Sequence, residues 1–162
     1  MRTSTKSVLF SVFFILFIAV SCGEKDPPTT DDGPFNISEL VGNWEATYAS
    51  FIRDSDEMAV EIVGDGGTVT MVVQSSGRFT MTIDPVDRAA YTVSGEMFWE
   101  IWEGNYYFSI EWADYPGDWD SYGATLTGDT LEINGSFETG EYDFDNDGTP
   151  DSSRVRFTFV RS

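Results

Sequence analysis

The sequence predicts an all-β fold, which we expect to be a single antiparallel up-and-down β-barrel of about eight to ten strands after a short N-terminal helical turn. From residue 35 onward, apolar and polar side chains alternate with a period of two, the pattern of strands that bury one face. Short turn signals such as Ser75-Ser76-Gly77 and Gly128-Asp129 separate the alternating segments. Because no long crossover intervenes, consecutive strands are expected to pair as hairpins.

The expected elements follow one another along the folded part of the chain. A helical turn comes first, capped by Asn36 or Ser38 and continued by residues 39–41. The alternation then covers residues 44–48, 69–73, 79–83, 106–112, 124–127, 130–134 and 155–159. A meander of this length closes most simply on itself, which places the last strand beside the first.

Composition excludes several classes of function. The chain has 162 residues, which allows one domain, and its 28 acidic against 9 basic residues give a net charge of −19. Such a field repels phosphate backbones, so nucleic acid is not an expected partner. There is no histidine and only one cysteine, which excludes histidine-dependent catalysis, His-ligated zinc or haem, and an internal disulfide.

Residues 1–21 have the pattern of an export signal. Arg2 and Lys6 precede an apolar run over residues 8–20, which is short for a permanent membrane span. The run ends at Ala19-Val20-Ser21-Cys22-Gly23, which resembles a bacterial lipobox and implies lipidation of Cys22. An ordinary secretory signal with an incidental cysteine is the alternative. The expected location is the cell envelope, lipid-anchored in the outer membrane, on its periplasmic or surface face.

The mature chain divides into two parts. Residues 22–34 contain Pro, Thr, Asp and Gly but, after Cys22, no apolar side chain, which predicts a flexible tether. Residues 35–162 form the expected barrel domain. Removing Arg2 and Lys6 with the signal leaves 7 basic residues against 28 acidic ones, a net charge of −21.

The start of the barrel domain resembles a known family. Residues 37–44 end in Gly42-x-Trp44, which resembles the opening of bacterial lipocalin-like domains. The resemblance implies that Trp44 plugs the closed end of the barrel and that a basic residue of the last strand packs across its ring. Alternation places Arg161 on the inward face of that strand, where Trp44 would supply a cation–π partner. The alternative is an ordinary core tryptophan and a surface arginine.

An acidic loop precedes the last strand. Residues 143–151 read D-x-D-x-D-G-x-x-D, which resembles the start of a calcium loop of the dockerin or thrombospondin type-3 kind. The candidate ligands of a structural Ca²⁺ ion are Asp143, Asp145, Asp147, Thr149 and Asp151. The twelfth position, a bidentate glutamate in an EF-hand, is Arg154 here, so the ligand set is incomplete. An acidic Asp-Gly turn without a metal is the alternative.

Aromatic residues gather between residues 98 and 122. Both strand parities are aromatic there, so one set is expected on the outer face or at a rim, and Trp119 is expected in a loop. The candidate ligand-binding residues are Trp99, Trp102, Trp112 and Trp119. Packing of the barrel is the alternative reading of the same residues.

These features predict a lipid-anchored, non-enzymatic envelope protein that holds a small apolar ligand in a lipocalin-like barrel, with the membrane as a partner through the lipid. The alternative is a carbohydrate-binding or surface-interaction module that uses the aromatics around Trp119. Acidic residues between 96 and 120 could supply a glycosidase pair, but their spacing selects none, so no catalytic residue is expected.

Overall fold

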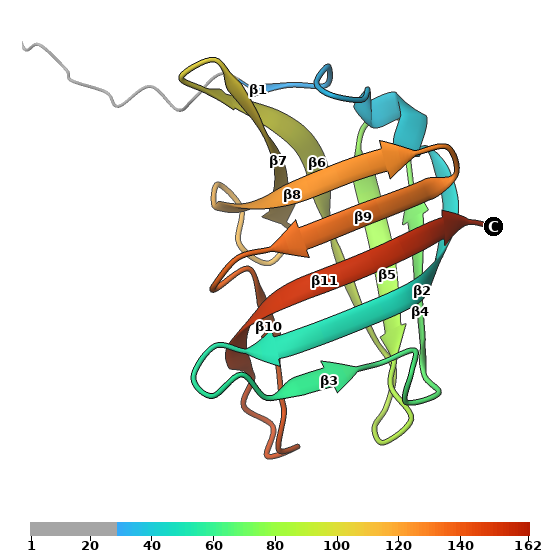
Figure 1. The fold of residues 1–162 in the computed structure, drawn as a ribbon, viewed down its shortest axis with the longest axis vertical. Coiled ribbons are helices and arrows are strands. Elements are labelled where there is room, and N and C mark those ends of the chain that lie inside the picture. The colour runs from blue at the N-terminus through green and yellow to red at the C-terminus, as the bar shows by residue number, and fades with distance from the viewer. Residues whose placement is uncertain (1–28) are drawn as a thin grey trace, which may run out of the picture.

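Eight antiparallel strands close into a barrel in the computed structural model, which describes residues 29–162 (Figure 1). The strands of the ring are β2 (Gly42–Arg53), β4 (Thr68–Val73), β5 (Arg78–Asp84), β6 (Tyr91–Trp102), β7 (Asn105–Trp112), β8 (Trp119–Thr127), β9 (Thr130–Gly135) and β11 (Asp151–Arg161). Each pairs with the next in this order, and β11 pairs back with β2. The predicted all-β, up-and-down barrel is therefore confirmed.

Three short strands lie outside the ring. They are β1 (Thr29–Thr30) on β6, β3 (Ala59–Glu61) on β2, and β10 (Gly140–Tyr142) on β11. The only helical element in residues 29–162 is a 3₁₀ turn, η1 (Ile37–Leu40). No helix in this part of the chain combines the length and the hydrophobicity that a membrane span requires.

The alternation that predicted the strands sets their two faces. On β4, residues 69, 71 and 73 are buried while residues 68, 70 and 72 are exposed, and Val72 keeps half of its surface in solvent. β5 repeats the pattern with Phe79, Met81 and Ile83 buried. The inward rows of β2, β9 and β11 complete an apolar core, which includes Phe51, Ile133 and Phe157.

The 3₁₀ turn η1 plugs one end of the barrel. Asn36 caps it through a reciprocal capping box with Glu39, and Ile37 and Leu40 point into the core. The indole nitrogen of Trp44, which is 1% exposed, donates a hydrogen bond of 2.7 Å to the Leu40 carbonyl. This plugged end is called the closed end below.

Arg161 lies over Trp44 at the closed end, where the alternation of the last strand predicts it. The two residues are register partners on β11 and β2, and the guanidinium carbon is 4.3 Å from the ring centroid. Gly42 beside them has a φ of +136°, and a Cβ there would lie 3.0 Å from Nη1 of Arg161. Both the backbone conformation and the close approach therefore require glycine at the start of β2.

The flexible tether predicted over residues 22–34 is too long. Thr29 and Thr30 form β1, which pairs with Glu100 and Trp99 of β6, and Asp32 bridges to Asn36. The backbone of this segment is thus hydrogen-bonded to the domain, so residues 29–34 belong to the fold. Residues 22–28, Cys22 and the predicted signal over residues 1–21 lie outside the described residues.

Candidate functional site

The inward side chains do not fill the barrel. A cavity of about 520 Å³ remains inside the ring. All eight strands of the ring contribute lining residues, β2 only from its second half, and the loops at the end opposite η1 line it as well. Its deep surface is apolar, with Met71, Phe79, Met81, Ile110 and Phe157 among the lining residues. Close-packed cores rarely leave voids larger than a water molecule, and ligand pockets have volumes of roughly 300–1,000 Å³. The cavity is therefore the candidate functional site.

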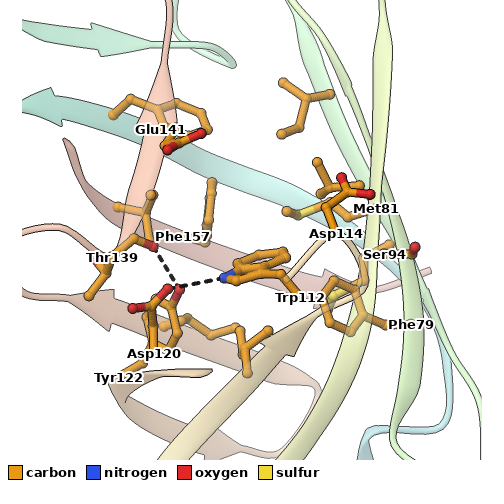
Figure 2. A pocket seen from close by; sticks show the side chains of 18 of the residues that line it. Phe79, Met81, Ser94, Trp112, Asp114, Asp120, Tyr122, Thr139, Glu141 and Phe157 are labelled. Carbon is orange, nitrogen blue, oxygen red and sulfur yellow. Dashed lines mark hydrogen bonds between the residues drawn. The ribbon is translucent and has the colours of Figure 1, made fainter. Parts of the chain in front are cut away.

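The mouth of the cavity is acidic. The loops and strand ends opposite the closed end place four carboxylates in its lining, Asp114, Asp120, Glu138 and Glu141. No lysine or arginine is among the residues that line it. An apolar interior thus opens through a rim that carries negative charge only. Figure 2 shows Glu141 and Asp114 on opposite sides of the pocket, with the Trp112 ring between the two sides.

Asp120 differs from the other three carboxylates because it faces into the barrel. It pairs with buried Ile110 across β7 and β8 and shares the inward face of β8 with buried Tyr122. Oδ2 accepts a hydrogen bond of 3.3 Å from the indole nitrogen of Trp112 (Figure 2). Burial raises the pKa of the Asp120 carboxyl, the Trp112 hydrogen bond lowers it, and the charges of Asp118 and Glu141 raise it further, so the net shift is upward.

The position of Trp112 depends on a small residue between two large ones. Phe79, Gly95 and Trp112 lie side by side on β5, β6 and β7, in register. The Phe79 and Trp112 rings meet edge to face at 5.7 Å between centroids. A Cβ on Gly95 would lie 3.0 Å from the Phe79 ring and 2.4 Å from the Glu111 carbonyl. Glycine therefore lets the two rings meet across the middle strand and form one wall of the cavity.

Tyr122 and Thr139 line the side of the cavity opposite Phe79 (Figure 2). The Tyr122 hydroxyl donates a hydrogen bond of 2.7 Å to the backbone carbonyl of Thr139, which ties β8 to the segment before β10 (Figure 2). Burial raises the pKa of the Tyr122 phenol, so the hydroxyl is protonated at neutral pH. Burial also raises the pKa of Tyr91, which lines the cavity from β6. Both phenols thus present neutral surface to the interior.

Of the four tryptophans predicted to bind a ligand, only Trp112 lines the cavity. Trp99 is buried at the closed end, where its indole nitrogen donates to the Phe35 carbonyl at 2.9 Å. Trp102 is 55% exposed at the end of β6. Trp119 was predicted in a loop, but it begins β8 and lies on the outer face, with Phe98 at 5.8 Å between ring centroids.

Trp119 and Phe98 belong to a separate outer groove of about 420 Å³. The groove runs between β1 and the outer face of β6, β7 and β8, and Glu96 and Glu111 also line it. The indole nitrogen of Trp119 donates to Glu100 at 3.0 Å, which fixes the ring against the sheet. This groove is polar and open compared with the barrel interior.

The acidic loop brings together three of its five predicted ligands. Carboxylate oxygens of Asp143, Asp145 and Asp147 lie within 4.8 Å of one another. Desolvation would raise the pKa of the Asp143 carboxyl, but hydrogen bonds from the N–H groups of Gly148, Asp147 and Asn146 outweigh it and lower the pKa. Gly148 has a φ of +91°, as the calcium-loop pattern predicts.

The remaining two predicted ligands behave differently. Asp151 begins β11, and its carboxylate forms an ion pair of 3.2 Å with Arg53, so it is not part of the three-carboxylate group. Thr149 is exposed, and its N–H donates to the Asp147 carboxylate at 2.8 Å. Pro150, which follows, lines the cavity. The loop therefore stands beside the cavity mouth.

The sequence interpretation missed Asp120, Tyr122 and Phe79 as site residues. The alternation within residues 119–127 was a usable signal for Asp120, since it puts this residue in phase with Tyr122. Comparisons of the chain with models of protein families, with curated proteins and with solved structures found no match.

Proposed function

We propose that this protein is a non-enzymatic, lipocalin-like binding protein of the bacterial envelope, which holds a small apolar ligand inside the barrel. The observation that carries the proposal is the hollow interior of about 520 Å³. Burying apolar surface contributes about 25 cal/mol per Å² to binding or folding, so an unfilled apolar cavity is a favourable site for an apolar molecule.

The lining supports an apolar ligand over a polar one. Met71, Met81 and Met97 contribute flexible side chains that adapt to an irregular shape, while Phe79 and Trp112 contribute flat aromatic surface. Few hydrogen-bonding groups reach the deep part of the cavity. A strongly polar ligand would lose its hydration there without replacement.

We further propose that the protein is anchored in the outer membrane through lipid on Cys22. Thr29, the first described residue, pairs with Glu100 near the closed end of the barrel. Six residues lie between positions 22 and 29, and the seven steps from one position to the other span at most about 25 Å in an extended chain. The lipid would therefore hold the closed end toward the bilayer and leave the mouth of the cavity facing away from it.

Native mass spectrometry of residues 29–162, purified without detergent, tests the binding function. This segment contains every strand and core residue described above. We expect a co-purifying mass of small-molecule size, or saturable quenching of tryptophan fluorescence by apolar probes in a ligand-free preparation. A ligand-free spectrum together with no quenching by any probe would rule out the proposal.

The second candidate function is carbohydrate binding in the outer groove. The specific observation in its favour is that Trp119 and Phe98 present aromatic surface beside Glu96 and Glu111, a combination suited to stacking on sugar rings. Retention on polysaccharide gels that is lost in Trp119→Ala but kept in Trp102→Ala would favour this function. Trp102 is the matched control because it is exposed but does not line the groove.

We also propose that the acidic loop binds a structural Ca²⁺ ion. The supporting observation is the convergence of Asp143, Asp145 and Asp147. Hard carboxylate oxygens are the ligands that Ca²⁺ prefers. The ion would stiffen the segment that leads into β11 and would have no role in chemistry.

A further inference from the structure

The charge at the cavity mouth restricts which apolar ligands the barrel can accept. Four carboxylates and no basic side chain line the cavity. An apolar ligand with an anionic head, such as a fatty acid, would have to bring its charge next to the partly buried carboxylate of Asp120 and close to three exposed carboxylates. Like charges at such short range repel each other. The lining therefore disfavours anionic amphiphiles.

Asp120 lacks a cationic partner although it faces the apolar interior. None of the ion pairs in the described part of the chain includes Asp120, and its one side-chain hydrogen bond is that from Trp112 at 3.3 Å. A carboxylate has room for about four hydrogen bonds, so most of its acceptor capacity remains available. An inward carboxylate without a cation is costly to the fold and favours a positively charged ligand group.

Arg88 has partners of its own and does not neutralise this site. Arg88 lies outside the cavity lining, where it pairs with Asp87 at 3.0 Å, donates to the backbone carbonyl of Asp143 and stacks over Tyr142 at 4.7 Å. These contacts hold the guanidinium of Arg88, and it forms no ion pair with Asp120. The charge at the mouth therefore remains negative.

Aromatic surface surrounds the same carboxylate. Trp112 donates to Asp120, Tyr122 is two residues along the same inward face, and Tyr115 lines the mouth. Aromatic faces attract ammonium groups through their quadrupoles, most strongly where water is excluded. A carboxylate beside aromatic rings thus binds an organic cation better than it binds a hydrated metal ion.

We propose that the ligand of the barrel is an amine with an apolar body, whose ammonium group binds Asp120 while the body occupies the cavity. This inference rests on the proposed function, because it identifies the class of molecule that the same cavity takes. Glu141 and Asp114 at the rim add long-range attraction for the cation as it enters.

Calorimetric titration of the full chain in phosphatidylcholine nanodiscs tests the inference. The probes are naphthylethylamine, naphthylethanol and naphthylacetate, which share one apolar body and differ in the charge of the head. Empty nanodiscs correct for partitioning into lipid. At pH 7 we expect the amine to bind at least about tenfold more tightly than the alcohol, as for a charge-assisted hydrogen bond, and the carboxylate to bind most weakly.

The outcomes separate the two proposals. Saturable binding of the alcohol with no advantage for the amine would overturn the amine inference and leave the apolar cavity function standing. No saturable binding of any of the three probes would overturn both.

Paired variants test the role of Asp120 itself. Asp120→Asn keeps an acceptor for Trp112 but removes the charge, so the ratio of amine to alcohol affinity should fall toward one. Asp118→Asn removes a nearby charge that does not line the cavity, so the ratio should be kept. An unchanged ratio in Asp120→Asn would overturn the assignment. The probe series on the unmodified chain stands even if a variant fails to fold.

Discussion

Arg161 joins the last strand of the barrel to its plug by lying across Trp44, with 4.3 Å between the guanidinium carbon and the ring centroid. Its Nη1 and Nη2 atoms donate to the carbonyls of Val41 and Glu39 at 2.6 and 2.7 Å. These carbonyls end the 3₁₀ turn, so one side chain both covers the ring and satisfies backbone groups of the plug. The closed end is therefore a cooperative unit.

Truncation of this pair should reveal the coupling. Trp44→Ala should cost about 3–5 kcal/mol, as for other buried aromatics, and Arg161→Ala about 2 kcal/mol, because the ring contact and the two charge-assisted hydrogen bonds are lost together. Urea denaturation of the single and double variants measures both values and their coupling. Arg156→Ala on the exposed face of the same strand is the control and should change stability by less than about 0.5 kcal/mol. Additive costs would contradict the account of the closed end.

Asp120 should make the protein less stable at neutral pH than its amide variant. Burial and the charges of Asp118 and Glu141 raise the pKa of Asp120 in the folded state above its ordinary value of 3.8. A raised pKa in the folded state means that stability is lost as pH rises through that pKa, since the charged form is penalised only in the fold. Asp120→Asn should therefore be more stable than the unmodified protein at pH 7.

The same comparison at pH 3 is the internal control. There Asp120 is protonated in both states, and the difference in unfolding free energy between the two proteins should vanish. Urea denaturation at a series of pH values between 3 and 7 measures it. A lower stability of Asp120→Asn at pH 7 would show that the charged carboxylate has a partner in the fold after all.

The sequence predicted the strands of the barrel better than it predicted the barrel's interior. Alternation within single strands is a local signal, so it located seven of the eight strands of the ring, all but β6, and the inward position of Arg161. The hollow interior depends on strand tilt and on side-chain volumes that meet across the barrel, which no local pattern records. β1 has two residues, too few to show any periodicity.

The positions of the tryptophans along the barrel could not be predicted for the same reason. Trp99 and Trp112 both face inward on neighbouring strands, but Trp99 lies beside Phe35 at the closed end and Trp112 lies in the cavity wall. Parity gives the face of a residue, while its height in the barrel depends on the register between strands and on the N-terminal plug. A sequence alone cannot separate the two roles.

Calcium should stabilise the protein selectively through the acidic loop. Binding to the folded loop alone raises stability by about 2.7 kcal/mol at a hundredfold excess over Kd, and magnesium should do less because it keeps its waters. Melting curves in chelator, in calcium and in magnesium at matched ionic strength measure this. The calcium shift should vanish in Asp145→Asn/Asp147→Asn. Equal shifts from calcium, magnesium and sodium would indicate charge screening of an acidic protein instead.

Lipidation is predicted at Cys22, the only cysteine of the chain. When the full chain is expressed in a bacterium, the unmodified protein should fractionate with membranes and incorporate labelled acyl chains, because two or more acyl chains anchor a protein stably. Cys22→Ser should lose the label. A serine variant that keeps its acyl label would disprove the lipobox interpretation.

The most direct test of the central claim, that the hollow of the barrel is a binding site, is to fill it. Val93→Trp adds an indole where Val93 lines the cavity, whereas Val72→Trp adds the same group at a position that is 50% exposed on the outer face. Titration with naphthylethanol, with folding checked by circular dichroism, compares the two variants with the unmodified protein. We predict that Val93→Trp weakens binding at least about tenfold, since the added ring occupies volume that the ligand needs, and that Val72→Trp binds as the unmodified protein does. Equal binding by all three proteins would contradict the account and place the ligand outside the barrel.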